Sequence, residues 1–163
     1  MFATSFVAFL FALPIALAMP QGTTPPPTPP TCPGQGQIHP NGVYNKCLDV
    51  QGALFQNGTP VQVYDCNGSP AQTWDYIRGS TKVQLRGTNY CLDAGSSPGN
   101  GVHMKIWTCY GGLSAQQWYY TDDSRIALQG QGQCLDLSGG NLSNGNYVQT
   151  WQCGGGNTNQ IWV

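Results

Sequence analysis

The sequence predicts an all-β domain in which three equivalent repeats share one core around a pseudo-threefold axis. The triplet Cys-Leu-Asp recurs at intervals of 44 and 43 residues, at 47–49, 91–93 and 134–136. A second cysteine follows each triplet after a similar gap, at Cys66, Cys109 and Cys153. Each repeat then closes with Gln-x-Trp, at 72–74, 116–118 and 160–162. Three markers in the same order three times indicate three structurally equivalent units.

Residues 1–18 precede the repeats and form an apolar stretch that ends in Ala-Leu-Ala. This ending is the small-x-small pattern that signal peptidase reads, so we expect a secretory signal peptide. An uncleaved membrane anchor is the alternative. The run is shorter than the about 20 residues that span a bilayer, and Pro14 interrupts it. We therefore expect an extracellular protein with no membrane span.

Residues 19–36 are rich in proline and threonine and lack the apolar residues of a core. Such a composition favours an extended, semi-rigid spacer. The spacer contains Cys32, the one cysteine outside the three repeats. Cys32 either pairs with a second chain, which would give an oligomer, or stays a free thiol.

The folded domain is expected at residues 37–163, with repeats at about 37–87, 88–130 and 131–163. Within the repeats, short alternating runs are separated by Gly, Asn, Ser and Pro, which is typical of strands and turns. No stretch outside the apolar N terminus shows sustained helical periodicity. The clearest strand-like runs are VQVYDC, KVQLR, MKIWTC, RIALQ and YVQTWQC.

The cysteines of the repeats support both the repeat structure and the extracellular location. Six cysteines allow 15 pairings, and the equivalence of the repeats favours the pattern Cys47–Cys66, Cys91–Cys109 and Cys134–Cys153. Each bridge would close a loop of about 20 residues and stabilise the fold by roughly 3 kcal/mol. Zinc binding has little support because no closely spaced cysteine pair exists and only two histidines, His39 and His103, are present. We expect no metal and no cofactor.

Charge is scarce, which limits the classes of partner. The chain has six Lys and Arg, seven Asp, no Glu and a net charge of −1. Nucleic acid is not an expected partner, because phosphate binding needs a concentrated basic surface. Three N-glycosylation sequons, at Asn57, Asn67 and Asn141, fit a secreted glycoprotein.

The pattern "CLD … C … QxW", repeated three times, resembles the ricin B-type (R-type) lectin domain and is similar to the xylan- and galactose-binding modules of the same fold. The resemblance implies a β-trefoil of twelve strands with one potential sugar site per repeat. The third repeat matches every site position of the family, with Asp136, Gln149, Trp151, Asn159 and Gln160. The first repeat offers Asp49, Gln62 and Tyr64, with Ala71 where the third has Asn159. The second keeps Asp93 and Trp107, but Lys105 replaces the glutamine and Ala115 the asparagine. This ranks the third repeat first and the second last.

These residue types suit an uncharged sugar. A carboxylate accepts hydrogen bonds from two neighbouring hydroxyls, and amides both donate and accept. A tryptophan or tyrosine ring covers the C–H face of a pyranose and removes apolar surface from water. Gln149 and Trp151, two residues apart on a strand, point to the same side. Open sites of this kind bind weakly, with Kd near ~1 mM, and several sites together raise the apparent affinity.

Each candidate has a structural alternative. The aspartates at positions 49, 93 and 136 would also serve to bond the main chain of a turn, and the aromatic residues Tyr64, Trp107 and Trp151 would also pack across strands. An exposed ring would decide in favour of binding. By contrast, Trp74, Trp118 and Trp162 are expected in the shared core.

Catalysis is not expected. A glycosidase pair would have to come from aspartates that the pseudo-threefold symmetry keeps apart, and neither histidine lies in a nucleophile motif. We expect a secreted lectin for galactose- or N-acetylgalactosamine-type glycans. Two alternatives are a targeting module for xylan or a similar polysaccharide, without its catalytic partner, and a protease inhibitor of the same fold.

Overall fold

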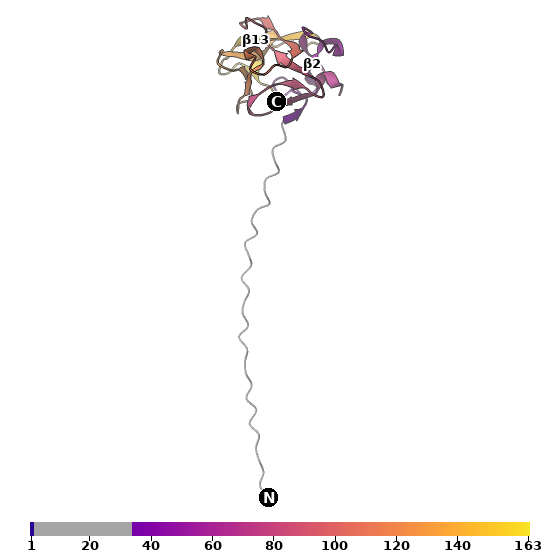
Figure 1. Cartoon of the computed structure of the whole chain (residues 1–163), viewed down its shortest axis with the longest axis vertical. Helices are drawn as coiled ribbons and strands as arrows, with labels where there is room; N and C mark the ends of the chain where they lie inside the picture. The colour runs from indigo at the N-terminus through magenta and orange to yellow at the C-terminus, as the bar shows by residue number, and fades with distance from the viewer. Residues whose placement is uncertain (2–33) are drawn as a thin grey trace. The chain divides into compact units, whose positions relative to one another are not determined.

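The computed structural model describes residue 1 and residues 34–163, and the latter form a domain of short strands (Figure 1). The predicted signal peptide, most of the predicted spacer and Cys32 lie outside the described residues. Among the described residues, no helix is long and apolar enough to cross a membrane. Strand β1 (Gly34–Gly36) pairs with β4 (Trp74–Tyr76), so the sheet begins three residues before the predicted start at residue 37.

The strands follow the predicted repeats. The first repeat contains β2 (Lys46–Val50), β3 (Val61–Asp65), β4 (Trp74–Tyr76), β5 (Gly79–Thr81) and β6 (Gln84–Leu85). The second contains β7 (Tyr90–Asp93), β8 (Val102–His103), β9 (Lys105–Thr108), β10 (Trp118–Tyr120) and β11 (Ile126–Leu128). The third contains β12 (Gln133–Leu137) and β13 (Asn146–Gln152). All five strand-like runs of the sequence contain strands, which confirms the prediction.

The described helices are five short 3-10 turns at equivalent places in the repeats. Three of them carry the glutamine of Gln-x-Trp at their last residue: η2 (Pro70–Gln72), η3 (Ser114–Gln116) and η5 (Thr158–Gln160). The other two follow the aspartate strands, η1 (Gln51–Ala53) after β2 and η4 (Ser138–Gly140) after β12. Short turns of this kind connect strands without adding a helical layer.

One antiparallel hairpin organises each repeat: β2 with β3, β7 with β9, and β12 with β13. Thirteen strands are assigned among the described residues instead of the expected twelve. One reason is a break at Met104 between β8 and β9, where the equivalent β13 continues unbroken. The hairpins contact one another through the pairs Tyr147–Gln62 and Gln149–His103.

The ring of repeats closes where the domain begins and ends. The main-chain N–H of His39 donates to the carbonyl of Val163 at 2.7 Å, and the Val163 N–H donates back to His39 at 3.0 Å. This pairing joins the first repeat to the third. The fold is therefore the β-trefoil that the sequence predicted.

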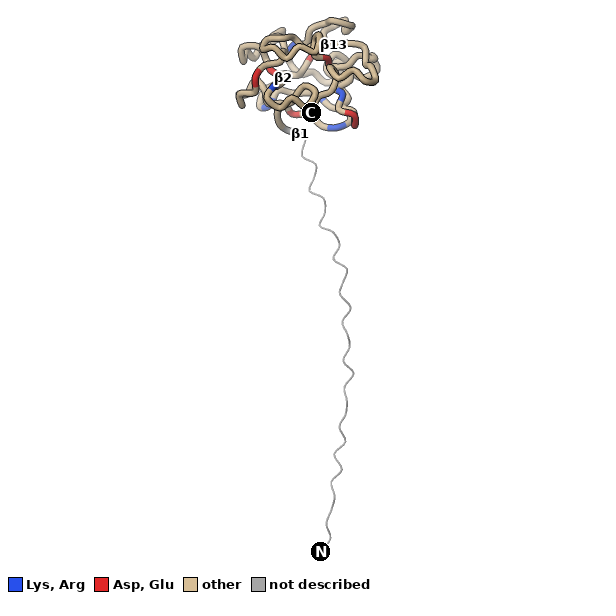
Figure 2. The backbone as a smooth tube through the Cα atoms, turned by 180° about the vertical axis from the view of Figure 1, so that it is seen from behind, with Lys and Arg blue, Asp and Glu red and all other residues tan. Residues whose placement is uncertain are grey.

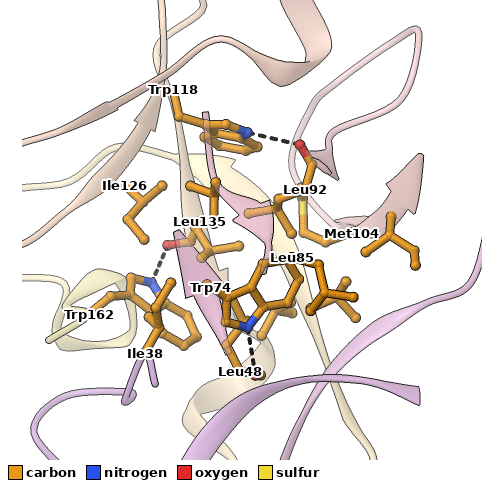
Figure 3. Close-up of a cluster of buried hydrophobic side chains, with 14 of the residues drawn as sticks. Ile38, Leu48, Trp74, Leu85, Leu92, Met104, Trp118, Ile126, Leu135 and Trp162 are labelled. Carbon is orange, nitrogen blue, oxygen red and sulfur yellow. Dashed lines mark hydrogen bonds between the residues drawn. The ribbon is translucent and has the colours of Figure 1, made fainter. Parts of the chain in front are cut away.

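The closing tryptophans meet in one core (Figure 3). Trp74, Trp118 and Trp162 are each fully buried, which confirms their expected place. Each indole Nε1–H donates to the carbonyl of the leucine in the Cys-Leu-Asp triplet of its own repeat, at 2.9–3.1 Å. The last marker of every repeat is thus tied to the first, and a buried indole keeps its polar group paired.

The three predicted disulfides are present: Cys47–Cys66, Cys91–Cys109 and Cys134–Cys153. Each bridge joins the start of a hairpin's first strand to the end of its second, close to the aspartate. Charged positions are few and scattered over the domain (Figure 2), in agreement with the composition.

Candidate functional site

The aspartate of each repeat lies near the C-terminal end of the first strand of its hairpin. Asp49 and Asp136 are in the last pair but one of the ladder, and Asp93 is in the last pair. Asp49, Asp93 and Asp136 pair across the ladder with Gln62, Lys105 and Gln149. All three aspartates are buried to 95% or more, yet each lines an open surface hollow. A ligand would therefore reach each carboxylate from one direction only.

In each repeat, the buried glutamine of Gln-x-Trp donates a hydrogen bond to the aspartate carboxylate from the interior of the protein. Gln160 is fully buried, its Oε1 accepts from the Gly154 N–H, and its Nε2 donates to the Gln152 carbonyl and to Asp136 Oδ2 at 3.2 Å. Gln72 and Gln116 make the equivalent contacts with Asp49 and Asp93. The expectation that Gln160 contacts sugar is therefore wrong, because both polar atoms of its amide are used inside the protein. Gln160 is a positioning residue.

The hollow of the third repeat has a volume of about 340 Å3. Asp136 Oδ1 accepts from Gln149 Nε2 at 2.9 Å, and Oδ2 accepts from Asn157 Nδ2 at 3.1 Å as well as from Gln160. An ionised carboxylate has about four acceptor positions. Three protein donors leave one position for a ligand hydroxyl and fix the direction in which it points.

The sequence reasoning did not identify Asn157. Its side chain lines the third hollow, donates to Asp136, and accepts from the Asn159 N–H at 3.1 Å at the start of η5. An asparagine two residues before Asn159, directly preceding a turn, has the character of a capping residue. That local pattern was the available signal, and it explains how the turn is held against the carboxylate.

Asn159 also lines the third hollow and depends on a glycine beside it. Gly140 has φ +65°, and a Cβ at that position would lie 2.8 Å from Asn159 Oδ1. Real Cβ atoms do not approach oxygen so closely, so Gly140 provides the space for the amide. In the first repeat, Ala53 occupies the equivalent place at the end of η1 with φ +52°, and Ala71 replaces the asparagine.

Trp151 is 42% exposed and lines the third hollow beside Gln149, and Tyr64 is 40% exposed and lines the first. Rings with this exposure are accessible to a ligand, which favours the expectation of binding. Trp107 is half-buried and lies near Gly58 of the first repeat, where an added Cβ would be 3.8 Å from the ring. Each of the three hollows therefore has an aromatic ring and a carboxylate in its lining, and the rings of the third and first hollows are the more exposed.

The first hollow has a volume of about 300 Å3. Asp49 accepts from Gln62 Nε2 at 2.9 Å on one oxygen and from Gln72 Nε2 at 3.0 Å on the other. Burial raises the pKa of the Asp49 carboxyl above its ordinary value, and the hydrogen bonds from Gln62 and Gln72 oppose this shift without cancelling it. This site keeps its carboxylate and ring but lacks the asparagine amide.

The second hollow differs most. Asp93 Oδ1 accepts the main-chain N–H of Gly95 at 2.8 Å, and Oδ2 accepts from Gln116. Lys105 Nζ lies 3.7 Å from Oδ1. The structural alternative, an aspartate that bonds the main chain of a turn, therefore describes Asp93, but it does not describe Asp49 or Asp136, whose donors are side-chain amides.

One group of potential metal ligands lies close together among the described residues: His39, Cys47 and Cys66. Both sulfurs belong to the same disulfide, so they offer no thiolate. His39 Nδ1 lies 2.8 Å from the carbonyl of Lys46, to which it donates. The group is a packed disulfide with a hydrogen-bonded histidine rather than a metal site.

The family model described as the ricin-type beta-trefoil lectin domain matches residues 34–162. The chain belongs to this family. A ricin-type lectin domain is a carbohydrate-binding, non-catalytic module, and the matched residues include all three hollows. A comparison with curated protein sequences finds no match.

Solved structures agree with the fold of the ricin-type domain. A designed threefold-symmetric protein, ThreeFoil, has 27% identity and a TM-score of 0.69, over 78% of this chain and 95% of that one. The Macrolepiota procera ricin B-like lectin in complex with lactose has 17% identity and a TM-score of 0.65, over 83% and 97%. An agglutinin from Abrus precatorius has 19% identity and a TM-score of 0.66, over 80% and 48%.

Proposed function

We propose that this domain is a secreted lectin for galactose- or N-acetylgalactosamine-type glycans, with the third hollow as its principal site. The observation that carries the proposal is the combination of Asp136, Asn159 and the exposed ring of Trp151 around one hollow. The carboxylate accepts one ligand hydroxyl at its remaining position, the amide of Asn159 donates and accepts, and the indole covers a C–H face.

A similar solved structure supports the choice of a galactoside as the first ligand to test. The Macrolepiota procera lectin, a similar fold, is in complex with lactose, which carries a terminal galactose. The first hollow, with Asp49, Gln62 and Tyr64, is proposed as a weaker site for the same class, because Ala71 removes one amide. The second hollow lacks the glutamine and the asparagine and is the weakest for a neutral sugar.

Trp151→Ala tests the principal site better than a change at Asp136. The ring is exposed, so its removal leaves the core intact, whereas loss of the buried carboxylate would leave three amide donors unpaired. Tyr119→Ala is the matched control, since Tyr119 is 47% exposed and is not in the lining of the three hollows that contain the aspartates.

The assay is calorimetric titration with methyl galactoside and N-acetylgalactosamine, and with xylan oligosaccharides as the competing ligand class. We expect Trp151→Ala to lower galactoside affinity about tenfold, in line with roughly 1–2 kcal/mol for a buried ring face, and Tyr119→Ala to leave it unchanged. Equal affinity in both variants would refute the site. Tighter binding of xylan oligosaccharides would make the domain a polysaccharide-targeting module.

Secretion is part of the proposal and rests on the three disulfides together with the predicted signal peptide at 1–18. The sequon asparagines Asn57, Asn67 and Asn141 are exposed. Asn57 and Asn141 are proposed as glycosylation sites, whereas Asn67 lines the first hollow, where an N-glycan would compete with the ligand. For Cys32, a bridge between chains and a free thiol are the two alternatives. Electrophoresis of the secreted protein with and without reductant tests the pairing, and a monomer in both lanes would refute it.

A further inference from the structure

The second hollow combines a cation with an aromatic ring. It is the largest of the three, at about 540 Å3 compared with about 340 and 300 Å3. Lys105 stands where the other repeats have Gln62 and Gln149. A glutamine amide donates and accepts, whereas an ammonium group has three donors, a full positive charge and no acceptor.

The contacts of Lys105 leave these donors available. Its Nζ lies 3.7 Å from Asp93 Oδ1, which is an ion pair but too long for a hydrogen bond. That oxygen already accepts from the Gly95 N–H, and the other accepts from Gln116 Nε2. Within the part of the chain that the structure describes, no residue accepts a hydrogen bond from the side-chain ammonium of Lys105.

The ring of Trp107 lies next to the same ammonium group, with Nζ 5.7 Å from the ring centroid. Pro98, Leu113 and Ala115 add apolar lining. A sugar ring packed on the indole would therefore bring a substituent of the same ring within reach of Nζ. An oxyanion substituent would supply the acceptor that Lys105 lacks.

The charges in the three hollows also favour an anionic ligand in the second one. In the second, Lys105 compensates the charge of Asp93. Among the described residues, no Lys or Arg lies within 4 Å of the carboxylates of Asp49 and Asp136. An anionic ligand would meet an uncompensated like charge in the first and third hollows but not in the second.

We propose that the second hollow binds an anionic sugar, one whose pyranose ring carries a carboxylate or a sulfate ester. Trp107 packs against the ring, and Lys105 Nζ donates to the oxyanion. The inference rests on the proposed lectin function and adds a second ligand class to it. The domain would then bind neutral sugars in two repeats and charged sugars in one.

The test uses the whole protein labelled with 15N, observed through its five indole N–H signals during titration with methyl galactoside, methyl galacturonide and galactose 6-sulfate. The signals of the buried residues Trp74, Trp118 and Trp162 serve as internal references. We expect the anionic sugars to shift the Trp107 signal, to bind about tenfold more tightly there than the galactoside, and to weaken with added salt.

Lys105→Gln recreates the amide of the other repeats and should abolish the preference for the anionic sugars. Lys46→Gln makes the same charge change in the first repeat, where the ammonium pairs with Asp65 outside the hollows, and should leave the preference intact. Comparing galacturonide with the sulfate shows which oxyanion is preferred.

The inference is overturned if the anionic sugars shift Trp151 instead of Trp107, or if Lys105→Gln binds them as the unchanged protein does. A galactoside that shifts Trp151 while the anionic sugars shift no indole signal would refute this inference and leave the proposed function standing. No shift with any of the sugars would refute both.

Discussion

Gly140→Ala is expected to lower galactoside affinity at the third site, although it replaces none of the residues proposed to contact the ligand. An added Cβ would lie 2.8 Å from Asn159 Oδ1, so the amide must move out of its place in the hollow. The backbone itself tolerates the change, because Ala53 occupies the equivalent turn in the first repeat at φ +52°. The domain should therefore stay folded while binding at the third site weakens.

The expected magnitudes follow from these two contacts. An alanine at φ +65° costs about 1 kcal/mol of folding free energy relative to glycine. Displacing the amide removes one hydrogen bond to ligand, worth about 0.5–1.5 kcal/mol. Galactoside affinity at the third site should therefore fall roughly 2- to 13-fold.

The assay is a double-mutant cycle with Asn159→Ala, measured by calorimetry in a Tyr64→Ala, Trp107→Ala background that leaves one ring-bearing hollow. If the glycine acts by making room for the amide, Gly140→Ala adds nothing once Asn159 is removed. Additive losses would refute the reasoning, and so would unchanged affinity in Gly140→Ala alone. The reverse change in the first repeat, Ala53→Gly with Ala71→Asn, should strengthen galactoside binding there, and Ala71→Asn alone should not.

Three further outcomes are expected. Trp118→Phe leaves the Leu92 carbonyl unpaired in the core and should lower the free energy of unfolding in urea by about 2–4 kcal/mol. Replacing Cys134 and Cys153 together by alanine opens a loop with a sequence separation of 19 and should cost about 3 kcal/mol in the same measurement. Because burial raises the Asp49 pKa above 3.8, acidification should protonate the first site before an ordinary aspartate, so galactoside binding there is lost early. The same group makes the folded state more stable as pH falls from the raised value towards 3.8. An NMR titration of the Asp49 carboxyl carbon with a midpoint at or below 3.8 would contradict this.

The repeated markers were sufficient to predict the fold from sequence. The leucine of the triplet and the tryptophan of the closing motif are joined by a hydrogen bond in every repeat. The two motifs therefore recur together because their residues are in contact in the folded domain. The disulfides follow from the same equivalence. Strand alternation also placed Gln149 and Trp151 on one face, because side-chain direction along a strand has a period of two.

The direction of the amides in the turns was not predictable in the same way. Gln160 and Asn159 are adjacent in sequence, yet the first is buried behind the carboxylate and the second lines the hollow. Their separation depends on the path of η5, which the Asn157 side chain fixes through one main-chain contact. The requirement for Gly140 likewise arises from a residue 19 positions away in the chain, and no local pattern reports it.

The lining of the first and third hollows comes from a single repeat in each case, and the closing glutamine of that repeat donates to the carboxylate. The residues that line the first hollow fall between 49 and 71, and those of the third between 136 and 159. Substitutions that retune one pocket therefore leave the scaffold of its neighbours untouched, and the shared core fixes the three openings in constant orientation. On the proposed assignments, ligand preference can change in the first or the third repeat separately, and one small domain would bind neutral and charged sugars on the same glycan surface.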